Sequence, residues 1–299
     1  MKSKYKGIFY IISSAFFFAL MNAFIHLSGD LPFYQKAFFR NFVAMLVALS
    51  LLLKDRAKGN KIHLTKGSFK YLFMRAAFGT LGLLGNFYAV DRLVLSDASM
   101  LQKISPFAAI IASYFVLKEK IKPFQIIIVL TAFVGCLFVI KPSMTNVASF
   151  PAFVALLGGV GAGLAYTMVR KLGEMKVKGP FIVFFFSAFS CVILLPFVIV
   201  DFHPMSAYQW VMLLLVGAAA SGGQFSITAA YFHAPAKEIS IYEYTQIIFA
   251  ALFGFIFFGQ LPDVLSVVGY IIVTAAAMLS FMKSNSMLFF KKSENNQSI

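Results

Sequence analysis

The stretch "LSDASMLQKISPFAAIIASYFVLKEK", residues 95–120, is apolar over the length of a membrane-spanning helix and yet contains Lys103 and Pro106. About 20 apolar residues cross the roughly 30 Å hydrocarbon layer of a bilayer. A charge near the bilayer centre costs roughly 2.5–3.5 kcal/mol on insertion scales, and an internal proline removes a backbone donor and kinks the helix. A spanning helix with both features is expected to line a cavity, because irregular backbone at that depth needs water or neighbouring protein groups.

The whole chain is too apolar for a soluble protein. Of its 299 residues, 60% are hydrophobic and 12% are charged, and the mean hydropathy is +0.84; a soluble domain has about 25% charged residues. Apolar runs of spanning length recur at 7–28, 33–53, 68–90, 96–117, 122–141, 149–170, 179–200, 208–232, 238–258 and 264–283. The sequence therefore predicts an all-α integral membrane protein with ten transmembrane helices.

The distribution of basic residues predicts the orientation of these helices. With the N-terminus inside, every lysine and arginine outside the spans lies on the cytoplasmic side except Arg92 and Lys141. Such an excess of cytoplasmic Lys and Arg is the positive-inside pattern. It predicts a multi-pass protein of the cytoplasmic membrane with both termini cytoplasmic and residues 284–299 as a cytoplasmic tail. It also accounts for the net charge of +15 without a nucleic-acid partner.

An internal repeat appears when the chain is compared with itself at a shift of 141 residues. Gly82 then falls on Gly223 and Ala109 on Ala250, and the third to fifth spans fall on the eighth to tenth without a gap. The halves, 7–141 and 149–283, each hold five spans, so the second half enters the membrane from the opposite side. Two inverted repeats around a site at the membrane midplane are typical of alternating-access transporters.

A family resemblance supports this interpretation. The run "NFYAVDRLVLSDASMLQKISPFAAIIASYFVLKEKI", residues 86–121, resembles the signature region of EamA-type transporters in the drug/metabolite transporter superfamily. The resemblance extends over almost the whole chain and implies a ten-helix carrier for small metabolites, often amino acids or related compounds. The second half departs from the family pattern, because Ile247 stands where the proline would be and Gln260 replaces the terminal glutamate Glu119.

Two buried cations are candidates for an anion-binding site. With about 1.5 Å of rise per residue, Arg40 and Lys103 both lie on the order of 10 Å below the outer boundary. We expect them to form a positive, outward-facing pocket for a carboxylate, phosphate or sulfate. The alternatives are that they extend towards the outer boundary or pair with an acidic residue, namely Asp30, Asp91 or Asp97; Ser96 and Asp97 are themselves expected to cap the fourth span.

Arg75 and Glu243 lie at a similar depth from the inner boundary and are candidates for coupling or gating. They are close enough in depth to pair across the two halves as a structural or gating salt bridge. Glu243 also has a second interpretation as a proton- or cation-coupling site, because burial favours a protonated carboxyl group.

Uncharged polar residues complete the predicted binding site. A side-chain amide in hydrocarbon needs hydrogen-bond partners, and Pro106 is expected to kink its helix and free the carbonyl of Gln102 beside Lys103. The remaining substrate-binding candidates are Asn22, Tyr166, Gln224, Tyr242 and Gln246. Gly79, Gly82 and Gly85 recur on one side of the third span and predict close helix packing.

The motifs favour transport over catalysis. The sequence has no HExxH or GxGD motif and no glycine-rich phosphate loop, so we expect neither an intramembrane enzyme nor an intrinsic ATPase, and no cofactor or metal site. The leading interpretation is a secondary carrier of a small polar metabolite. An importer or exchanger of an organic anion or nucleoside-containing metabolite, and a channel or scramblase, are the alternatives. The expected partners are the metabolite, the bilayer and a coupling proton or ion, and both a monomer and a homodimer are compatible with the sequence.

Overall fold

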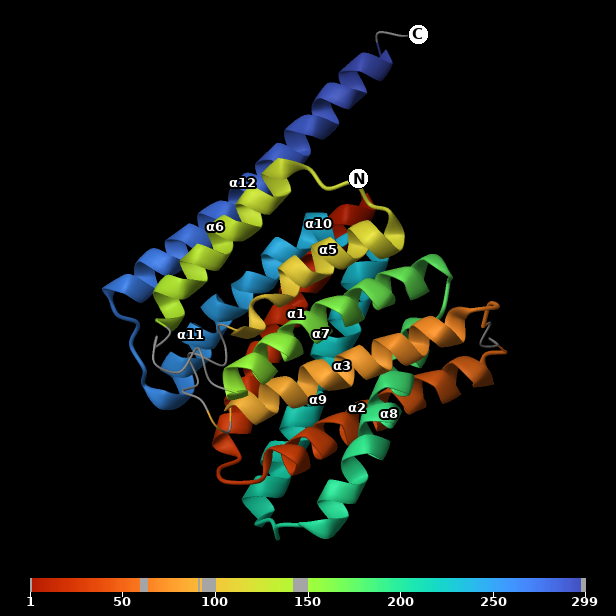
Figure 1. Ribbon diagram of the computed structural model, residues 1–299, viewed down its shortest axis with the longest axis vertical. Helices are drawn as coiled ribbons and strands as arrows, with labels where there is room; N and C mark the ends of the chain where they lie inside the picture. The colour runs from red at the N-terminus through yellow and green to blue at the C-terminus, as the bar shows by residue number, and fades with distance from the viewer. Residues whose placement is uncertain (1, 60–63, 91, 93–100, 142–149, 297–299) are drawn as a thin grey trace.

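The computed structural model describes residues 2–59, 64–90, 92, 101–141 and 150–296, with side chains described up to residue 283. Within this part of the chain all regular structure is helical (Figure 1). The first half contains α1 (Lys2–Leu27), α2 (Phe33–Ala57), α3 (Ser68–Val90), α5 (Ser105–Leu117) and α6 (Pro123–Ile140). The second half contains α7 (Phe150–Glu174), α8 (Gly179–Val200), α9 (Ala207–His233), α10 (Ala236–Ile239), the 3-10 helix η1 (Ser240–Thr245), α11 (Gln246–Phe258) and α12 (Val264–Asn296).

These elements match the ten predicted spans. Eight segments are long and apolar enough to cross a membrane, counting α10, η1 and α11 together as one of them, and α5 is a shorter apolar helix. The tenth, α3, is of spanning length but carries Arg75 and Lys70. The last helix, α12, continues to Asn296 and so includes most of the residues expected to form the polar tail.

Local sequence explains where several helices begin and end. Ser206 and Gln209 form a capping box at the start of α9, where the serine hydroxyl accepts from the Gln209 amide, satisfying a donor that the helix itself leaves free. Lys118, Lys141 and Gly259 adopt the left-handed conformation directly after α5, α6 and α11, which is a common way for a helix to stop.

The helix contacts have an approximate twofold symmetry between the halves. In one set of contacts α7 packs against α3 and α5, and in the equivalent set α1 packs against α9 and α11. Two further pairs, α2 with α8 and α6 with α12, each join a helix to its own equivalent in the other half. Almost all of the interhelical packing therefore joins one half to the other, and Figure 1 shows α6 beside α12 and α3 beside α7.

The shift of 141 residues found in the sequence also describes the structure. Adding 141 to the bounds of α5 (105 and 117) gives 246 and 258, which are the bounds of α11. Adding 141 to 123, the first residue of α6, gives 264, the first residue of α12. The predicted gapless match of the third to fifth spans with the eighth to tenth is thus confirmed for these elements.

Two predicted spans differ from the continuous helices that were expected. Pro106 does not kink a helix from within, because α5 begins at Ser105 and the proline occupies its first turn. There its missing N–H has no helical partner to lose. The span expected at 238–258 is also interrupted, in this case by the 3-10 helix η1. This second break forms without a proline, because the residue equivalent to Pro106 is Ile247. Each half therefore has a break at the same place in the repeat, with or without a proline.

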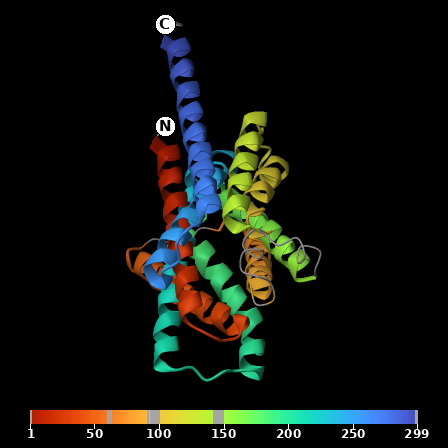
Figure 2. The same cartoon turned by 90° about the vertical axis from the view of Figure 1, so that its left-hand side faces the viewer.

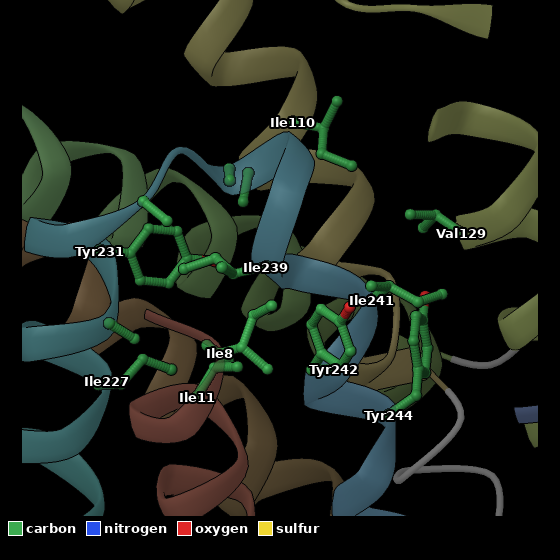
Figure 3. Packing of buried hydrophobic residues seen from close by; sticks show 14 of the residues in the cluster. Ile8, Ile11, Ile110, Val129, Ile227, Tyr231, Ile239, Ile241, Tyr242 and Tyr244 are labelled. Atoms are coloured by element: carbon green, nitrogen blue, oxygen red, sulfur yellow. The ribbon is translucent and has the colours of Figure 1, made fainter. Parts of the chain in front are cut away.

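The apolar packing follows the division between lipid and protein. The main buried cluster lies where α1, α9, α10 and η1 meet, and Figure 3 shows Ile8 and Ile11 pointing towards Ile239, Tyr231 and Tyr242. Large apolar residues such as Phe115, Val192 and Ile271 remain exposed, as expected for a surface in contact with acyl chains.

Glycines allow α3 and α7 to approach each other closely. A Cβ added at Gly82 would lie 3.1 Å from the Gly158 carbonyl oxygen, and one at Gly85 would lie 2.8 Å from the Gly158 Cα. The predicted packing role is confirmed for Gly82 and Gly85. At Gly79 an added Cβ would meet the guanidinium of Arg75 on the same helix and, at 2.9 Å, the ring of Phe186 on α8, so this glycine allows close packing against α8 and also makes room for Arg75.

The start of α1 and the end of α12 lie towards the same end of the molecule in both views (Figures 1 and 2). At that end Lys4 pairs with Glu238 at 3.4 Å and the Ser3 hydroxyl donates to the His233 carbonyl. At the opposite end, the C-terminus of α1 lies beside the C-terminus of α11, where the His26 and Phe258 rings are in contact.

Candidate functional site

A cavity of about 550 Å³ lies between the two halves, within the usual size range of small-molecule sites. Ten of the eleven predicted site residues line it: Asn22, Arg40, Arg75, Gln102, Lys103, Pro106, Tyr166, Gln224, Glu243 and Gln246. They come from α1, α2, α3, the segment before α5, α5, α7, α9, η1 and α11. The eleventh, Tyr242, packs within the apolar cluster of Figure 3 and is not among the described residues that line the cavity, so its contact with substrate stays a prediction.

Arg75 is buried and held by neutral groups. Its Nη2 donates to the Gln224 side-chain oxygen at 3.0 Å, and its guanidinium carbon lies 4.1 Å from the centre of the Phe186 ring. Such a cation–π contact stabilises a guanidinium without neutralising its charge. The side chain lies over Gly79, where an added Cβ would overlap with Nη1 of Arg75. This glycine therefore provides the space that the arginine occupies.

Arg40 is equally buried on α2. Its Nη1 donates to the Asn41 side-chain oxygen at 2.8 Å, and its Nε donates to the Met21 sulfur at 3.5 Å. The side chain is 3% exposed, so the alternative in which Arg40 extends to the outer boundary is wrong. Pairing of Arg40 with Asp30 is also absent from the ion pairs of the described residues, whereas Asp91, Ser96 and Asp97 lie outside those residues.

Lys103 connects the two interrupted segments. Its ammonium donates to the Gln246 side-chain oxygen at 2.8 Å, and its backbone carbonyl accepts from the Tyr244 hydroxyl at 3.1 Å. Tyr244 is the residue that the 141-residue shift places on Lys103. The two breaks therefore face each other across the approximate twofold axis, and Lys103 is directed towards the second half and not to the membrane boundary.

Glu243 and Arg75 do not form the predicted salt bridge. Glu243 accepts a hydrogen bond from the Tyr231 hydroxyl at 2.7 Å, whereas Arg75 uses Gln224, and the ion pairs of the described residues do not include the two together. Depth alone suggested the pair, but η1 turns Glu243 towards α9. Tyr231 stacks on Tyr166 with ring centres 5.3 Å apart, so these tyrosines fix the carboxylate beside the cavity.

The remaining predicted polar residues have different surroundings. The Gln102 amide donates to the Ala155 carbonyl of α7 at 3.2 Å, so it is already partly satisfied. Asn22 lines the cavity and is exposed, as is Gln260 just after α11. Both lie towards the end of the molecule away from the start of α1, so the described residues leave the cavity open at that end.

The other end of the molecule is closed by contacts among helix termini. The cavity lining on α1 begins at Ile11, and beyond it Arg170 donates to the Tyr231 and Phe232 carbonyls at the end of α9. Arg170 also lies 3.7 Å from the Glu119 carboxylate. Burial raises the pKa of Glu119, while the positive charge of Arg170 opposes that rise. The open end has its own ion pair, in which a hydrogen bond from Lys141 lowers the pKa of Asp263 to about 2.

Sequence reasoning did not identify several residues that build the site. Tyr231 orients Glu243, Phe186 packs against Arg75, and Asn41 holds Arg40. Only Asn41 had a usable signal, because it is an amide next to a buried arginine in an apolar helix. Tyr231 and Phe186 are aromatic residues within aromatic-rich helices, where the sequence does not distinguish them from packing residues.

A multi-pass membrane protein with a polar, charged cavity between two equivalent halves has the architecture of a solute transporter. The family model described as "EamA-like transporter family" matches residues 5–141 and again 149–282. The chain belongs to this family, and it is a membrane transporter.

Two of the similar proteins are named as an exporter and a transporter. The chain is 30% identical over 274 residues to the pseudopaline exporter CntI of Pseudomonas aeruginosa, covering 91% of this chain and 94% of that protein. It is 26% identical over 238 residues to a riboflavin transporter of Brucella anthropi, covering 76% and 80%. A solved crystal structure superposes with a TM-score of 0.79 at 12% identity, covering 95% of this chain and 99% of that one; this likeness concerns the fold alone.

Proposed function

We propose that the protein is a secondary active carrier that moves a small zwitterionic or anionic metabolite across the cytoplasmic membrane by alternating access. The observation that carries the proposal is a cavity between two inverted halves, open at one end, into which buried cations project. A solute bound between two such halves is exposed to one side or the other when the halves rock against each other.

The positive residues favour an anionic group on the solute. Arg40 and Lys103 are held by a methionine, an asparagine and a glutamine, none of which neutralises a charge. An organic acid or the carboxylate of an amino acid would supply the missing negative charge. Two relatives whose names specify a substrate act on pseudopaline and riboflavin, which is consistent with a metabolite of moderate size.

The orientation proposed for the carrier has both termini in the cytoplasm, because the basic loops cluster on that side of the chain. The described cavity then opens to the outside. Glu243 is the proposed coupling residue, because it is a carboxylate beside the cavity that accepts from Tyr231 and has no ion-pair partner among the described residues.

A metabolite screen followed by counterflow tests the carrier. Thermal-shift measurements on the purified protein would identify metabolites that raise its Tm, and proteoliposomes preloaded with each one would be assayed for uptake of the labelled compound. We expect saturable counterflow that is weakened in Lys103→Gln and Arg40→Gln proteins. Flux that does not saturate would instead indicate a channel or scramblase, and unchanged affinity in both variants would remove these two residues from the site.

The coupling role has a separate test. If Glu243 carries a proton, Glu243→Gln transport should lose its response to an imposed pH gradient while counterflow at equal pH continues. Transport by this variant that still depends fully on the gradient would contradict the assignment.

A further inference from the structure

The charges that face the cavity are unequal in number. Among the described lining residues, three are cations, namely Arg40, Arg75 and Lys103, and one, Glu243, is a carboxylate. The described wall thus carries a formal excess of two positive charges. An excess of this kind is costly in a membrane protein unless an anion compensates it.

None of the three cations forms a salt bridge with another described residue, although Glu243 lies close enough to Lys103 to interact with its charge. Their hydrogen-bond acceptors are the neutral side chains of Asn41 and Met21 for Arg40, Gln224 for Arg75 and Gln246 for Lys103. The Nε of Arg75 is buried and has no hydrogen-bond partner among the described residues. A guanidinium has five N–H donors, so both arginines retain donors for a ligand.

The cations and the carboxylate of the cavity come from different halves of the chain. Arg40, Arg75 and Lys103 belong to the first half of the chain, whereas Glu243 and the amides of Gln224 and Gln246 belong to the second. The amides of Gln224 and Gln246 contact Arg75 and Lys103 directly, so a ligand between the halves meets cations of the first half together with amides of the second.

The donors come from three different elements of the fold. The three cations come from α2, α3 and the segment before α5, and each is held by a different amide: Asn41, Gln224 or Gln246. A single phosphate is best bound by donors that converge on one point, such as a helix N-terminus or a glycine-rich loop. Separate cations suit two separate carboxylates, which arginine binds through paired hydrogen bonds.

We propose that the transported solute is a dicarboxylate with a net charge of about two negative units, and not a zwitterion or a monoanion. The proposal rests on the carrier function proposed above and narrows its solute class. One carboxylate binds at the two arginines and the other at Lys103, and the polar remainder of the solute faces Glu243 and the amides.

Binding of a graded series of probes to the purified protein in nanodiscs tests the solute class. Glutarate supplies two carboxylates, 4-aminobutyrate is a zwitterion of similar length, butyrate is a monoanion and glycerol phosphate is a phosphate dianion, all compared at equal ionic strength. We expect glutarate to raise Tm and to bind about tenfold or more tightly than the other three, since each charge-assisted contact contributes strongly to affinity.

Matched variants assign that preference to the cavity. In Lys103→Met and Arg75→Met proteins the preference for glutarate over butyrate should fall by about tenfold, because one carboxylate loses its cation. Lys66→Met, which changes an exposed loop lysine outside the cavity, should leave it unchanged. If Arg75→Met does not fold, Lys103→Met carries the test alone.

Three results would overturn the proposal: no binding of glutarate, equal or tighter binding of any of the other three probes, or a preference that survives in the Lys103 variant. Counterflow separates this failure from failure of the carrier function. Saturable counterflow of a zwitterion or monoanion would refute the dicarboxylate and leave the carrier intact, whereas glutarate binding without saturable flux of any bound compound would refute the carrier.

Discussion

At the scale of the residue, the site depends on small groups that make room for charged ones. Gly79 is the clearest case, because the Arg75 guanidinium occupies the space where a side chain at residue 79 would begin. On its other face the guanidinium contacts Phe186, so it cannot move aside without losing that contact or its hydrogen bond to Gln224.

Gly79→Ala should therefore impair the site although it adds a single methyl group. The new Cβ would displace the guanidinium and break the Arg75–Gln224 hydrogen bond, and a hydrogen bond to a charged group contributes about 1.5–3 kcal/mol. We expect solute affinity to fall by about tenfold, as measured by thermal shift. Gly179→Ala is the matched control, because its Cβ would make only an ordinary 3.6 Å contact with Thr228; equal affinity in the two variants would contradict this role of Gly79.

Single residues also show what the sequence could and could not predict about the site. Charged and amide residues in apolar spans are costly, so Arg40, Lys103 and Gln224 were recognisable from hydropathy alone, and they line the cavity. The hydrogen-bond partners of these residues could not be predicted, because they depend on how each helix is rotated about its axis and on where each side chain points. Arg75 and Glu243 share a depth, yet they face Gln224 and Tyr231.

At the scale of the element, the two interrupted segments are the structural feature that the repeat creates. The break before α5 and the break at η1 occupy equivalent positions and are joined by the Tyr244 hydroxyl and the Lys103 carbonyl. A carbonyl left free by a helix break is costly inside a membrane unless a neighbour satisfies it. Each break therefore stabilises the other, which explains why η1 persists without a proline.

Tyr244→Phe tests this mutual support. Loss of the hydroxyl leaves the Lys103 carbonyl without its described partner, so we expect the free energy of unfolding to fall by about 1–3 kcal/mol and solute affinity to weaken as Lys103 becomes less fixed. Thermal and denaturant unfolding in detergent would measure the change. Tyr114→Phe, at an exposed site on α5, should have no effect, and a similar loss in both variants would show that the Tyr244 hydroxyl has no special role.

The elements themselves were largely predictable, because membrane thickness fixes helix length and the repeat fixes helix order. The breaks were predictable only where the chain marks one. Pro106 indicated an irregularity, although it starts a helix and does not kink one, whereas nothing in "SIYEYT" (240–245) indicates a 3-10 helix. The break at η1 follows only from the structure, in which it faces the equivalent break before α5.

At the scale of the whole molecule, the described residues leave the cavity open at one end and close it at the other. Asn22 is exposed at the open end, whereas Lys66 lies in the loop between α2 and α3, which the proposed orientation places in the cytoplasm. The two native cysteines, Cys136 and Cys191, are buried, so introduced cysteines can be labelled against a low background.

Labelling of introduced cysteines tests both the orientation and the open end. In intact cells, a membrane-impermeant thiol reagent should label Asn22→Cys and not Lys66→Cys, and permeabilisation should make Lys66→Cys reactive. The opposite pattern would place the termini outside. If neither cysteine is labelled in intact cells, the cavity is closed to the outside in the cell.

The contacts at the closed end should determine which side the cavity faces. Lys4 and Glu238 join α1 of the first half to α10 of the second at 3.4 Å, so Glu238→Lys places like charges across this contact and should favour separation of the halves there. If access alternates, the outer opening closes as the inner one opens, and labelling of Asn22→Cys from outside should slow several-fold, in line with a coupling of about 1–3 kcal/mol between the two ends. Adding Lys4→Glu restores an ion pair with reversed charges and should restore the labelling rate. Unchanged labelling in the Glu238→Lys protein would mean that the two ends open independently, as they do in a channel.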